Sequence, residues 1–457
     1  MYTHSKFKDK KACVLGMGKS GIACARLLQR QGIDVMLSDE NVIPVPQSLK
    51  DMKVETGGHS QAVFDSDFII KSPGISHSKE IIKKLKKLGK PIFSEVEVAA
   101  AYAPEDCKIF AVTGTNGKTT TTMMLSEIMA AYVKKEGLGR KVYTVGNIGK
   151  PFASVADKIE PGSIVVIEVS SYQLEDSTFF HPYCSAILNI TPDHLEHHGS
   201  FANYVKAKAK IFKYQTAEES LILNGGDENC LALMKQAKCK VFSFSSTPHH
   251  QVRIDVIYDG DEMIFANGSH IKPPKLLIGI HNIENAMAAS LMAFAAGVDE
   301  KSVQSGFDTF NCIEHRIEYF ADYKGIKCYN DSKATNVDST VIALKALQSA
   351  NKIWLILGGR DKRAPYKPLL PFLNNYCKQV VLIGEATPII KKELAGRFPA
   401  VEKGDMKNAV SYILSSAQPG DIMLLSPACS SFDQFQDFED RGRKFKQIVL
   451  DYIKAHK

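Results

Sequence analysis

The sequence predicts an α/β protein made of three consecutive domains. The chain has 457 residues, which is more than one ordinary hydrophobic core accommodates. Short apolar segments alternate with amphipathic ones, and glycine-rich turns follow two of the apolar segments. From the changes in pattern along the chain, we expect domains over residues 1–104, 105–312 and 313–457.

Composition limits the classes of function. Hydrophobic residues make up 44% of the chain and charged residues 23%, as in ordinary globular proteins. The net charge of +7 comes from scattered Lys and Arg, and an anionic phosphate substrate accounts for it as well as a nucleic acid would. We expect no nucleic-acid partner.

Cysteine usage and hydropathy indicate a cytoplasmic protein. The ten cysteines form no C-x-x-C pair, which favours reduced thiols. The N-terminus is polar, and no apolar run approaches the roughly 18 residues of a spanning helix. We therefore expect no membrane insertion, and a monomer, because no heptad stretch demands a partner.

The first block reads as strand–helix–strand units. Strands are expected at 12–15, 35–38 and 68–71, with a helix over 22–31. Such alternation predicts a parallel sheet covered by helices. An alanine-rich helix then ends at Ala103–Asp106, a plausible linker because Pro104 interrupts it.

The second and third blocks continue the alternation. Strands of the second are expected at 109–112, 164–169, 186–190 and 220–223, with a hairpin within 252–265 turning at Asp259-Gly260. The third begins near His315, with strands at 353–357, 379–383 and 422–425. Both blocks are thus expected to be α/β, with no internal repeat.

The strongest motif is Thr113–Thr119, T-G-T-N-G-K-T, between an apolar strand and a helix. Glycines allow backbone N–H groups to surround phosphate oxygens at a helix N-terminus. Lys118 would neutralise the outer phosphates and the Thr119 hydroxyl would hold Mg²⁺. The strict pattern has glycine where this chain has Val112, so the loop is a variant. It predicts a central P-loop ATPase-type domain.

A second glycine-rich turn, Gly16–Gly21, matches G-x-G-x-x-G after the first strand, and Asp39 ends the next strand. This arrangement predicts a Rossmann-like N-terminal domain, with the acid near a ribose. A nicotinamide or flavin enzyme would fit, but a UDP-sugar carries the same diphosphate. The separate phosphate loop downstream argues against a dehydrogenase.

Together these motifs resemble the Mur ligase family over nearly the whole chain. The resemblance is carried, in the family's order, by 114–119, 168–175, 189–195, 281–285 and His315-Arg316. Segments 330–336, N-D-S-K-A-T-N, and 426–435 indicate the branch that adds D-glutamate. The resemblance implies a Rossmann-like C-terminal domain that binds D-glutamate and completes the ATP site.

The chemistry that the resemblance implies is ATP-dependent amide formation. ATP would phosphorylate the carboxylate of UDP-N-acetylmuramoyl-L-alanine, and the amine of D-glutamate would displace phosphate. Phosphorylation is needed because a carboxylate is a poor electrophile, and two anions meet only with metal ions and fixed cations. Because the motifs lie in all three blocks, we expect the third domain to close on the second.

The resemblance also assigns metal ligands for two Mg²⁺ sites. Thr119, Glu168 and His194 are implied directly, and Lys208 as a carbamate formed with CO₂. Lys206, Lys208 and Lys210 alternate on one helix, so periodicity alone does not choose among them. The neighbouring histidines 197 and 198 are expected to face solvent.

The remaining expected site residues fall into three groups. Those for ATP are Gly114, Thr115, Asn116, Gly117, Lys118, Thr119, Thr120, Asn282, Arg316 and Asp331. Those for the UDP-substrate are Lys19, Ser20, Asp39, Ser72, Gly74, Asn147 and Gln173. Those for D-glutamate are Thr335, Lys362, Ser431 and Phe438. Expected catalytic residues are Lys118, Glu168, His194 and Lys208.

Some alternatives stay open. Arg360 and Arg363 flank Lys362, so three cations are available for the γ-carboxylate of D-glutamate. A sister ligase adding another amino acid is a second enzyme interpretation. A nucleotide-binding regulator that uses its phosphate loop as a switch is an interpretation from another class, although a switch needs no second metal site.

Overall fold

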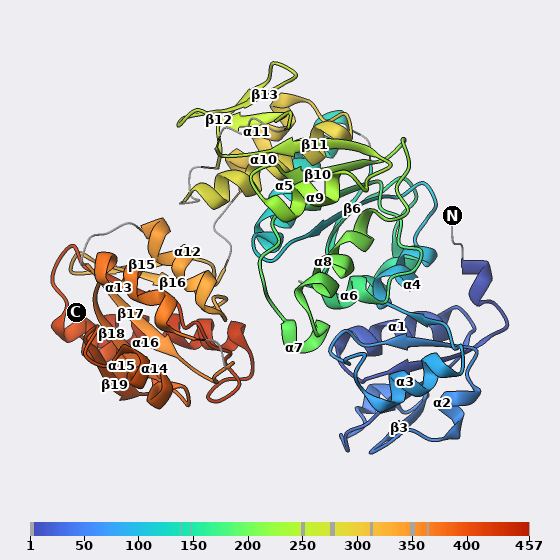
Figure 1. Ribbon diagram of the computed structural model, residues 1–457, viewed down its shortest axis with the longest axis horizontal. Helices are drawn as coiled ribbons and strands as arrows, with labels where there is room; N and C mark the ends of the chain where they lie inside the picture. The colour runs from blue at the N-terminus through green and yellow to red at the C-terminus, as the bar shows by residue number, and fades with distance from the viewer. Residues whose placement is uncertain are drawn as a thin grey trace. The chain divides into compact units, whose positions relative to one another are not determined.

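The computed structural model describes residues 4–137, 139–147, 149–247, 252–274, 279–310, 314–347, 352–362 and 365–456. The chain forms two compact units, Met1–Pro274 with His281–Phe310, and Lys275–Ile280 with Asn311–Lys457 (Figure 1). Each of the three expected domains holds one sheet. The expected boundary at residue 312 lies outside the described residues.

The first sheet is parallel, in the order β3-β2-β1-β4-β5. Its strands are β1 (Lys11–Leu15), β2 (Asp34–Asp39), β3 (Lys53–Thr56), β4 (Phe68–Lys71) and β5 (Ile92–Phe93), with helices α1 (Lys19–Arg30), α2 (Gln61–Asp65) and α3 (Glu80–Lys87). Because strand side chains alternate between faces, Val14 packs in the cluster with Leu27 of α1, and Leu15 in that with Leu85 of α3. The expected parallel sheet is confirmed.

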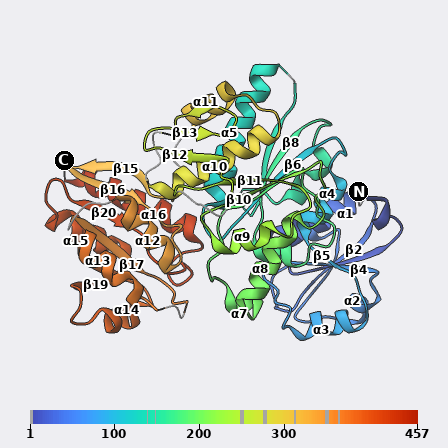
Figure 2. The ribbon, with the colours of Figure 1, turned by 45° about the horizontal axis from the view of Figure 1, so that its top comes forward.

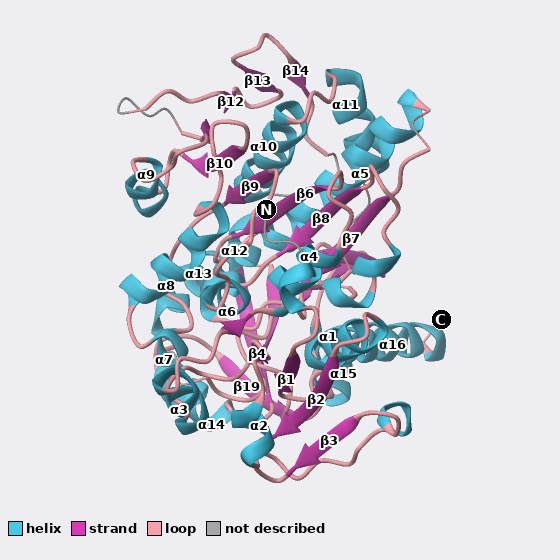
Figure 3. Ribbon diagram, turned by 90° about the vertical axis from the view of Figure 1, so that its right-hand side faces the viewer, coloured by secondary structure: helices cyan, strands magenta, loops and turns pink. Residues whose placement is uncertain are grey.

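The second sheet has the order β14-β13-β12-β11-β10-β9-β6-β8-β7. Its strands are β6 (Lys108–Thr113), β7 (Val142–Gly146), β8 (Ile164–Glu168), β9 (Cys184–Ile187), β10 (Ser220–Asn224), β11 (Lys240–Phe244), β12 (Val256–Tyr258), β13 (Met263–Phe265) and β14 (His270–Ile271). Strands β6, β8 and β7 lie side by side (Figure 3). The expected hairpin is confirmed as the antiparallel pair β12–β13.

Helices surround this sheet, and one strand expectation was wrong. The helices are α4 (Glu95–Tyr102), α5 (Lys118–Glu136), α6 (Ser171–Glu175), α7 (Leu195–His198), α8 (Phe201–Ala209), α9 (Glu228–Met234), α10 (Ile280–Ala295) and α11 (Glu300–Thr309). The strand expected at 186–190 ends at Ile187. Beyond it, Asn189 bonds the phosphate loop and the Ile190 N–H bonds the Asp227 carboxylate at 2.9 Å, so the chain leaves the sheet.

The third sheet has the order β15-β16-β20-β17-β18-β19, and among its described strands only β15 is antiparallel to its neighbour. This part of the chain carries the orange and red colours in Figure 2. Its strands are β15 (Glu318–Tyr323), β16 (Ile326–Asn330), β17 (Ile353–Gly358), β18 (Cys377–Ile383), β19 (Ala400–Gly404) and β20 (Ile422–Leu425). Its helices are α12 (Val337–Leu347), α13 (Leu370–Tyr376), α14 (Thr387–Leu394), α15 (Met406–Ser416) and α16 (Phe438–Ala455).

Alternation again sorts the core of the third sheet. Leu355 packs in one cluster with residues of α12, α13 and α14, whereas Ile356 packs in another with residues of α15 and α16. The α/β class is therefore confirmed in all three sheets. Across the described part of the chain, every helix is too short or too polar to cross a membrane.

Candidate active site

The phosphate loop joins β6 to α5 and has the backbone that its glycines permit. Gly114 and Gly117 have φ of 159° and 86°, in the range that side chains disfavour. A Cβ on Gly117 would lie 2.2 Å from Asn285 Oδ1. The Lys118 Nζ donates to the carbonyls of Gly114 and Thr115, both at 2.9 Å, so the ammonium lies over the turn.

The segment after β9 supports this loop. The Thr115 N–H donates to the Asn189 carbonyl at 3.0 Å, and the Asn116 N–H donates to the Asn189 side chain at 2.8 Å. The Thr115 hydroxyl lies 3.1 Å from the Thr191 carbonyl and 3.0 Å from the Tyr204 hydroxyl. The polar residues around 189–191 therefore fix the loop shape.

Glu168 is brought to the loop by sheet topology. Its strand, β8, pairs with β6 so that Glu168 lies opposite Val112. The Thr119 hydroxyl donates to Glu168 Oε2 at 2.7 Å, and the Asn147 amide donates to Oε1 at 2.8 Å. The structure thus brings three of the expected site residues together around one buried carboxylate.

Lys208 is distinguished from its neighbours by burial. Its side chain is buried, whereas Lys206 is exposed and Lys210 half-buried. The Lys208 Nζ donates to the Gly114 carbonyl at 2.7 Å. Burial, with the nearby Lys118 charge, holds the pKa of Lys208 well below its usual value. Three-dimensional packing thus selects the lysine that periodicity did not.

His194 immediately precedes the short helix α7, and two histidines within α7 were wrongly expected to face solvent. His194 has φ of 53° and lies beside Asp193, at 3.4 Å, and Tyr172. The side chains of His197 and His198 are only 8% and 0% exposed. A left-handed Gly199 ends α7, and both imidazoles bond residues of α6 instead of water.

Asn282 of α10 and Thr120 of α5, both expected at the ATP site, are buried beside the phosphate loop. The Asn282 side chain accepts from the Asn285 amide at 3.3 Å, and Asn285 accepts from the Thr121 hydroxyl at 3.3 Å, which connects α10 to α5. Thr120 is fully buried, and its hydroxyl has no hydrogen-bond partner among the described residues. Any contact of Thr120 with phosphate would therefore come from its backbone.

Five of the expected UDP-binding residues lie at the carboxyl edge of the first sheet, whereas Asn147 and Gln173 belong to the second domain. The Met17 N–H donates to the Asp39 carboxylate at 2.9 Å, and the Ser72 hydroxyl donates to the Gly16 carbonyl at 3.1 Å. A Cβ on Gly16 would lie 2.7 Å from that hydroxyl. Lys19 and Gly74 are exposed and Ser20 half-exposed. In open α/β sheets, ligands bind at the carboxyl edge where the strand order reverses. In this sheet the reversal lies between β1 and β4.

Gln173 has a local structural role that the sequence analysis missed. Its buried side chain accepts from the Ser170 N–H at 3.0 Å, while the Ser170 hydroxyl accepts from the Gln173 N–H at 3.3 Å. This reciprocal pair is a capping box at the start of α6. The S-x-x-Q spacing was the signal that could have revealed it.

In the second unit, Asp331 follows β16 and is buried beside β20. It accepts from the Ser426 hydroxyl at 2.8 Å and from the Ile317 N–H at 3.2 Å. Burial raises the pKa of Asp331 to about 7, opposed by Ser426 and Arg316. The Arg316 Nε is buried without a hydrogen-bond partner among the described residues, so this guanidinium keeps bonding capacity.

The loops expected to hold D-glutamate are joined by Arg441, which the sequence analysis did not identify. Its buried guanidinium donates to carbonyls of Ser332, Cys429 and Ser430. The Ser332 hydroxyl in turn donates to the Phe438 carbonyl at 2.8 Å. Segments carrying Thr335, Ser431 and Phe438 are thereby held together.

The cations near residue 362 differ in their surroundings. Arg360 lies 3.4 Å from Glu385, whereas Lys362 is exposed. Arg363 lies outside the described residues. The Arg360 N–H donates to the Ser430 carbonyl at 2.9 Å, which connects the chain just before Lys362 to the loop of Ser431.

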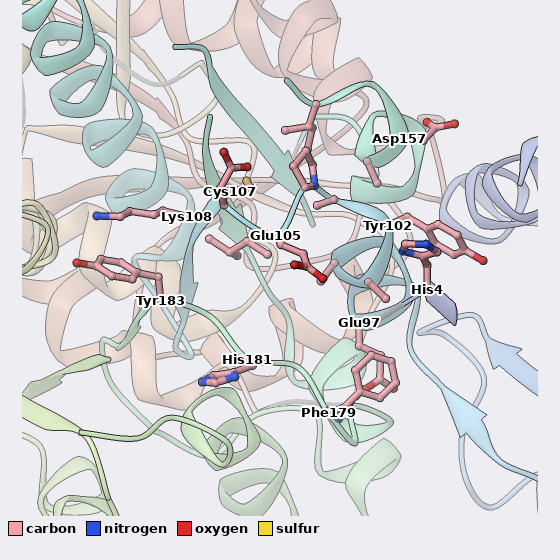
Figure 4. Close-up of a pocket in the computed structure, with 18 of the residues that line it drawn as sticks. His4, Glu97, Tyr102, Glu105, Cys107, Lys108, Asp157, Phe179, His181 and Tyr183 are labelled. Atoms are coloured by element: carbon pink, nitrogen blue, oxygen red, sulfur yellow. Dashed lines mark hydrogen bonds between the residues drawn. The ribbon is translucent and has the colours of Figure 1, made fainter. Parts of the chain in front are cut away.

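A hollow of about 540 Å³ lies at the opposite end of β6 from the phosphate loop (Figure 4). Lys108 lies 4.3 Å from the ring centre of Tyr183 there, and Tyr102 and Phe179 contribute further aromatic walls. None of the described residues lining it belongs to the expected site. This hollow is therefore not a guide to the chemistry here.

Comparison with known proteins covers all three sheets. Residues 10–94 match the "Mur ligase MurD-like, N-terminal domain", residues 112–293 the "Mur ligase middle domain", and residues 315–429 the "Mur ligase, glutamate ligase domain". The chain is similar to the UDP-N-acetylmuramoylalanine–D-glutamate ligases of Elusimicrobium minutum and Koribacter versatilis. Identities are 54% and 41%, over 98% and 97% of this chain and 99% and 97% of theirs.

A solved structure shows the same fold. The UDP-N-acetylmuramate-alanine ligase of Thermotoga maritima has a TM-score of 0.63 at 19% identity, covering 98% of this chain and 100% of that one. At such identity the likeness concerns the fold alone. The three domain matches and the full-length relatives confirm the predicted family: the chain belongs to the Mur ligases.

Proposed function

We propose that this chain ligates D-glutamate to UDP-N-acetylmuramoyl-L-alanine in peptidoglycan synthesis. ATP is converted to ADP and phosphate, and the product is UDP-N-acetylmuramoyl-L-alanyl-D-glutamate. The proposal rests most directly on the Thr119–Glu168 hydrogen bond, which places an acid at a phosphate loop. The full-length similarity to ligases of that name supports the choice of substrates.

The chemistry follows from the reactants. An oxygen of the acceptor carboxylate attacks the γ-phosphorus of ATP, and the bond to ADP breaks. The amine of D-glutamate then attacks the acyl carbon, loses a proton, and phosphate leaves with the carboxylate oxygen. Lys118, held over the loop by two carbonyls, neutralises phosphate charge during the first step.

The residues present fit Mg²⁺. The Thr119 hydroxyl and the Glu168 carboxylate are oxygen donors of the kind that this cation prefers. We assign them to one site, and His194 with a carbamate on Lys208 to a second. When bound, Mg²⁺ would reduce the repulsion between the phosphates and the acceptor carboxylate.

Lys208 fits carbamate formation. Burial lowers the pKa of Lys208 and so favours the neutral amine, which is the form that attacks CO₂. The carbamate would place negative charge near Lys118, where the ammonium form meets repulsion. Its N–H would still donate to the Gly114 carbonyl.

The other expected residues keep their proposed ligands. Asn282, Arg316 and Asp331 contribute to the nucleotide site, and the unpartnered Arg316 Nε is available for it. The edge with Gly16–Gly21, Asp39 and Ser72 takes the UDP group. Thr335, Lys362, Ser431 and Phe438 take D-glutamate. We further propose a monomer that acts in the cytoplasm.

Phosphate release from ATP tests the proposal. With UDP-N-acetylmuramoyl-L-alanine present, release should require D-glutamate and should fail with L-glutamate. Glu168→Gln should lower the rate by roughly 100-fold or more, because a charged group at the reacting phosphates is lost. Glu218→Gln is the matched control, since Glu218 is an exposed acid of the same domain.

Two other results of this assay would contradict the proposed function. Release that depends on a different amino acid would contradict the D-glutamate assignment and indicate a sister ligase. Nucleotide binding without release, for any muramoyl acceptor and amino acid, would contradict ligation and favour a regulator that uses the loop as a switch.

A further inference from the structure

Three side chains of types that can bind a metal meet between α6 and α7, close to His194. We name Glu175, His197 and His198 the α6–α7 cluster. The Glu175 Oε2 lies 2.9 Å from His197 Nε2, and Oε1 lies 3.5 Å from His198 Nδ1. One donor atom from each of the three falls within 4.8 Å of the others.

The cluster contains a buried ring nitrogen that has no hydrogen-bond partner among the described residues. The His198 side chain is 0% exposed, and its Nδ1 has no hydrogen-bond partner among the described residues, although it faces Glu175. The other ring nitrogen, Nε2, lies 3.0 Å from the Ser171 hydroxyl. A buried nitrogen that faces a carboxylate without a hydrogen bond leaves an interaction for a ligand to complete.

Neighbouring groups shield the cluster from bulk solvent and hold its rings. The Tyr172 ring packs edge-on against His197 at 4.3 Å between centres and stacks with His198 at 5.5 Å. Glu175 is itself only 15% exposed. The donors are therefore fixed in place by packing before any ligand arrives, which reduces the entropy lost on binding.

The charges nearby are consistent with a cation. Burial opposes ionisation of Glu175, but the imidazoles of His198 and His197 outweigh it and lower its pKa to about 2. Burial lowers the pKa of His197, which favours the neutral imidazole form that binds metals. Two nearby cations already have partners: Lys71 pairs with Asp176 at 2.8 Å, and the Lys210 ammonium donates to the Glu175 carbonyl.

The structure assigns to the α6–α7 cluster a binding site for Zn²⁺ or a similar transition-metal cation. Two imidazole nitrogens and one carboxylate, with a fourth position for water, form a familiar zinc donor set. Zinc bonds of about 2.0 Å in a tetrahedron separate donors by about 3.3 Å. Here one donor atom from each of the three side chains lies within 4.8 Å of the others, so a small inward shift of the donors completes the site. Two imidazoles disfavour Mg²⁺, which prefers oxygen.

Occupancy would connect two elements of the proposed active site. Glu175 ends α6, the helix that also carries Gln173. His197 lies three residues after His194. A metal between them would hold α7 against α6. The site therefore couples transition-metal binding to the loop that bears His194, and differs from the proposed Mg²⁺ centre.

Competition with a chromogenic zinc chelator, in saturating Mg²⁺, measures the affinity for Zn²⁺. We expect one bound Zn²⁺ that is weakened by roughly 100-fold or more in His197→Gln and in His198→Gln, because each removes a ligand. His270→Gln, at a 55% exposed histidine, should leave the affinity unchanged. So should Glu168→Gln, which separates this site from the Mg²⁺ centre.

Co²⁺ provides a second readout on the unaltered protein. Its visible absorption bands should indicate tetrahedral coordination with nitrogen ligands, and Zn²⁺ should abolish them. Affinity for Zn²⁺ that is unchanged in both histidine variants, or that disappears in Glu168→Gln alone, would overturn the assignment. Neither measurement depends on ligase activity, so the result is independent of the proposed function.

Discussion

Replacing Arg441 by methionine is the sharpest perturbation of the candidate D-glutamate loops. Methionine keeps much of the apolar stem but removes every donor of a buried guanidinium. Four hydrogen bonds are lost, two to the hydroxyl and carbonyl of Ser332 and two to the carbonyls of Cys429 and Ser430. The carbonyls would then be left with fewer donors inside a water-poor region.

The magnitude follows from those contacts. Removing one partner of a buried charged network costs about 3–5 kcal/mol, since buried polar groups lose their partners. At about 2–4 °C per kcal/mol for a unit of this size, 3 kcal/mol lowers the Tm by about 6–12 °C. The loops at 332 and 429–430 should separate, so the KM for D-glutamate should rise by roughly tenfold or more.

Thermal unfolding and steady-state kinetics together test this reasoning. Arg443→Met is the matched control, because Arg443 is an exposed arginine of the same helix and should change neither quantity appreciably. An Arg441→Met protein with the Tm and the KM for D-glutamate of the unaltered chain would refute the argument that Arg441 organises these loops.

Two further predictions concern buried ionisable groups. Burial raises the pKa of Glu97 from 4.5 to about 7, although the N–H groups of Thr178 and Phe179 oppose the shift. The folded state therefore holds this proton more tightly than the unfolded chain. The resulting stabilisation, on the order of 3 kcal/mol, is complete below pH about 4.5 and is lost as the pH rises through 7. Glu97→Gln should therefore flatten the decline in unfolding free energy between pH 5 and 8, measured by urea unfolding, and an undiminished decline would contradict the assignment. Lys208→Ala should lower ligation by roughly 100-fold or more, and short carboxylic acids should restore part of it, because a free carboxylate can replace the carbamate. Failure of every such acid to restore activity would contradict the carbamate proposal.

Elements and motifs governed by local chain chemistry were predictable. The turn at Gly16–Gly21 and the phosphate loop contain glycines with positive φ, a conformation that other residue types rarely adopt. Alternating apolar strands gave the parallel sheets, and because neighbouring strands end at one edge, the meeting of Thr119 with Glu168 followed from their positions.

Features that depend on tertiary neighbours were not predictable. His197 and His198 resemble ordinary surface residues in sequence, and only packing of α7 on α6 buries them. Arg441 lies in a helix rich in charged residues, so nothing local distinguishes the arginine that contacts Ser332, 109 positions earlier in the chain. Likewise, periodicity alone did not separate Lys208 from Lys206, and the burial of Lys208 depends on the packing of one face of α8.

Isotope transfer tests the central claim, ligation through an acyl phosphate, most directly. The acceptor UDP-N-acetylmuramoyl-L-alanine would carry ¹⁸O in both carboxylate oxygens, and the released phosphate would be examined by mass spectrometry. The account predicts one ¹⁸O atom in each phosphate formed with D-glutamate, because the attacking carboxylate oxygen leaves with phosphorus. Phosphate without ¹⁸O, formed alongside the amide product, would contradict the mechanism.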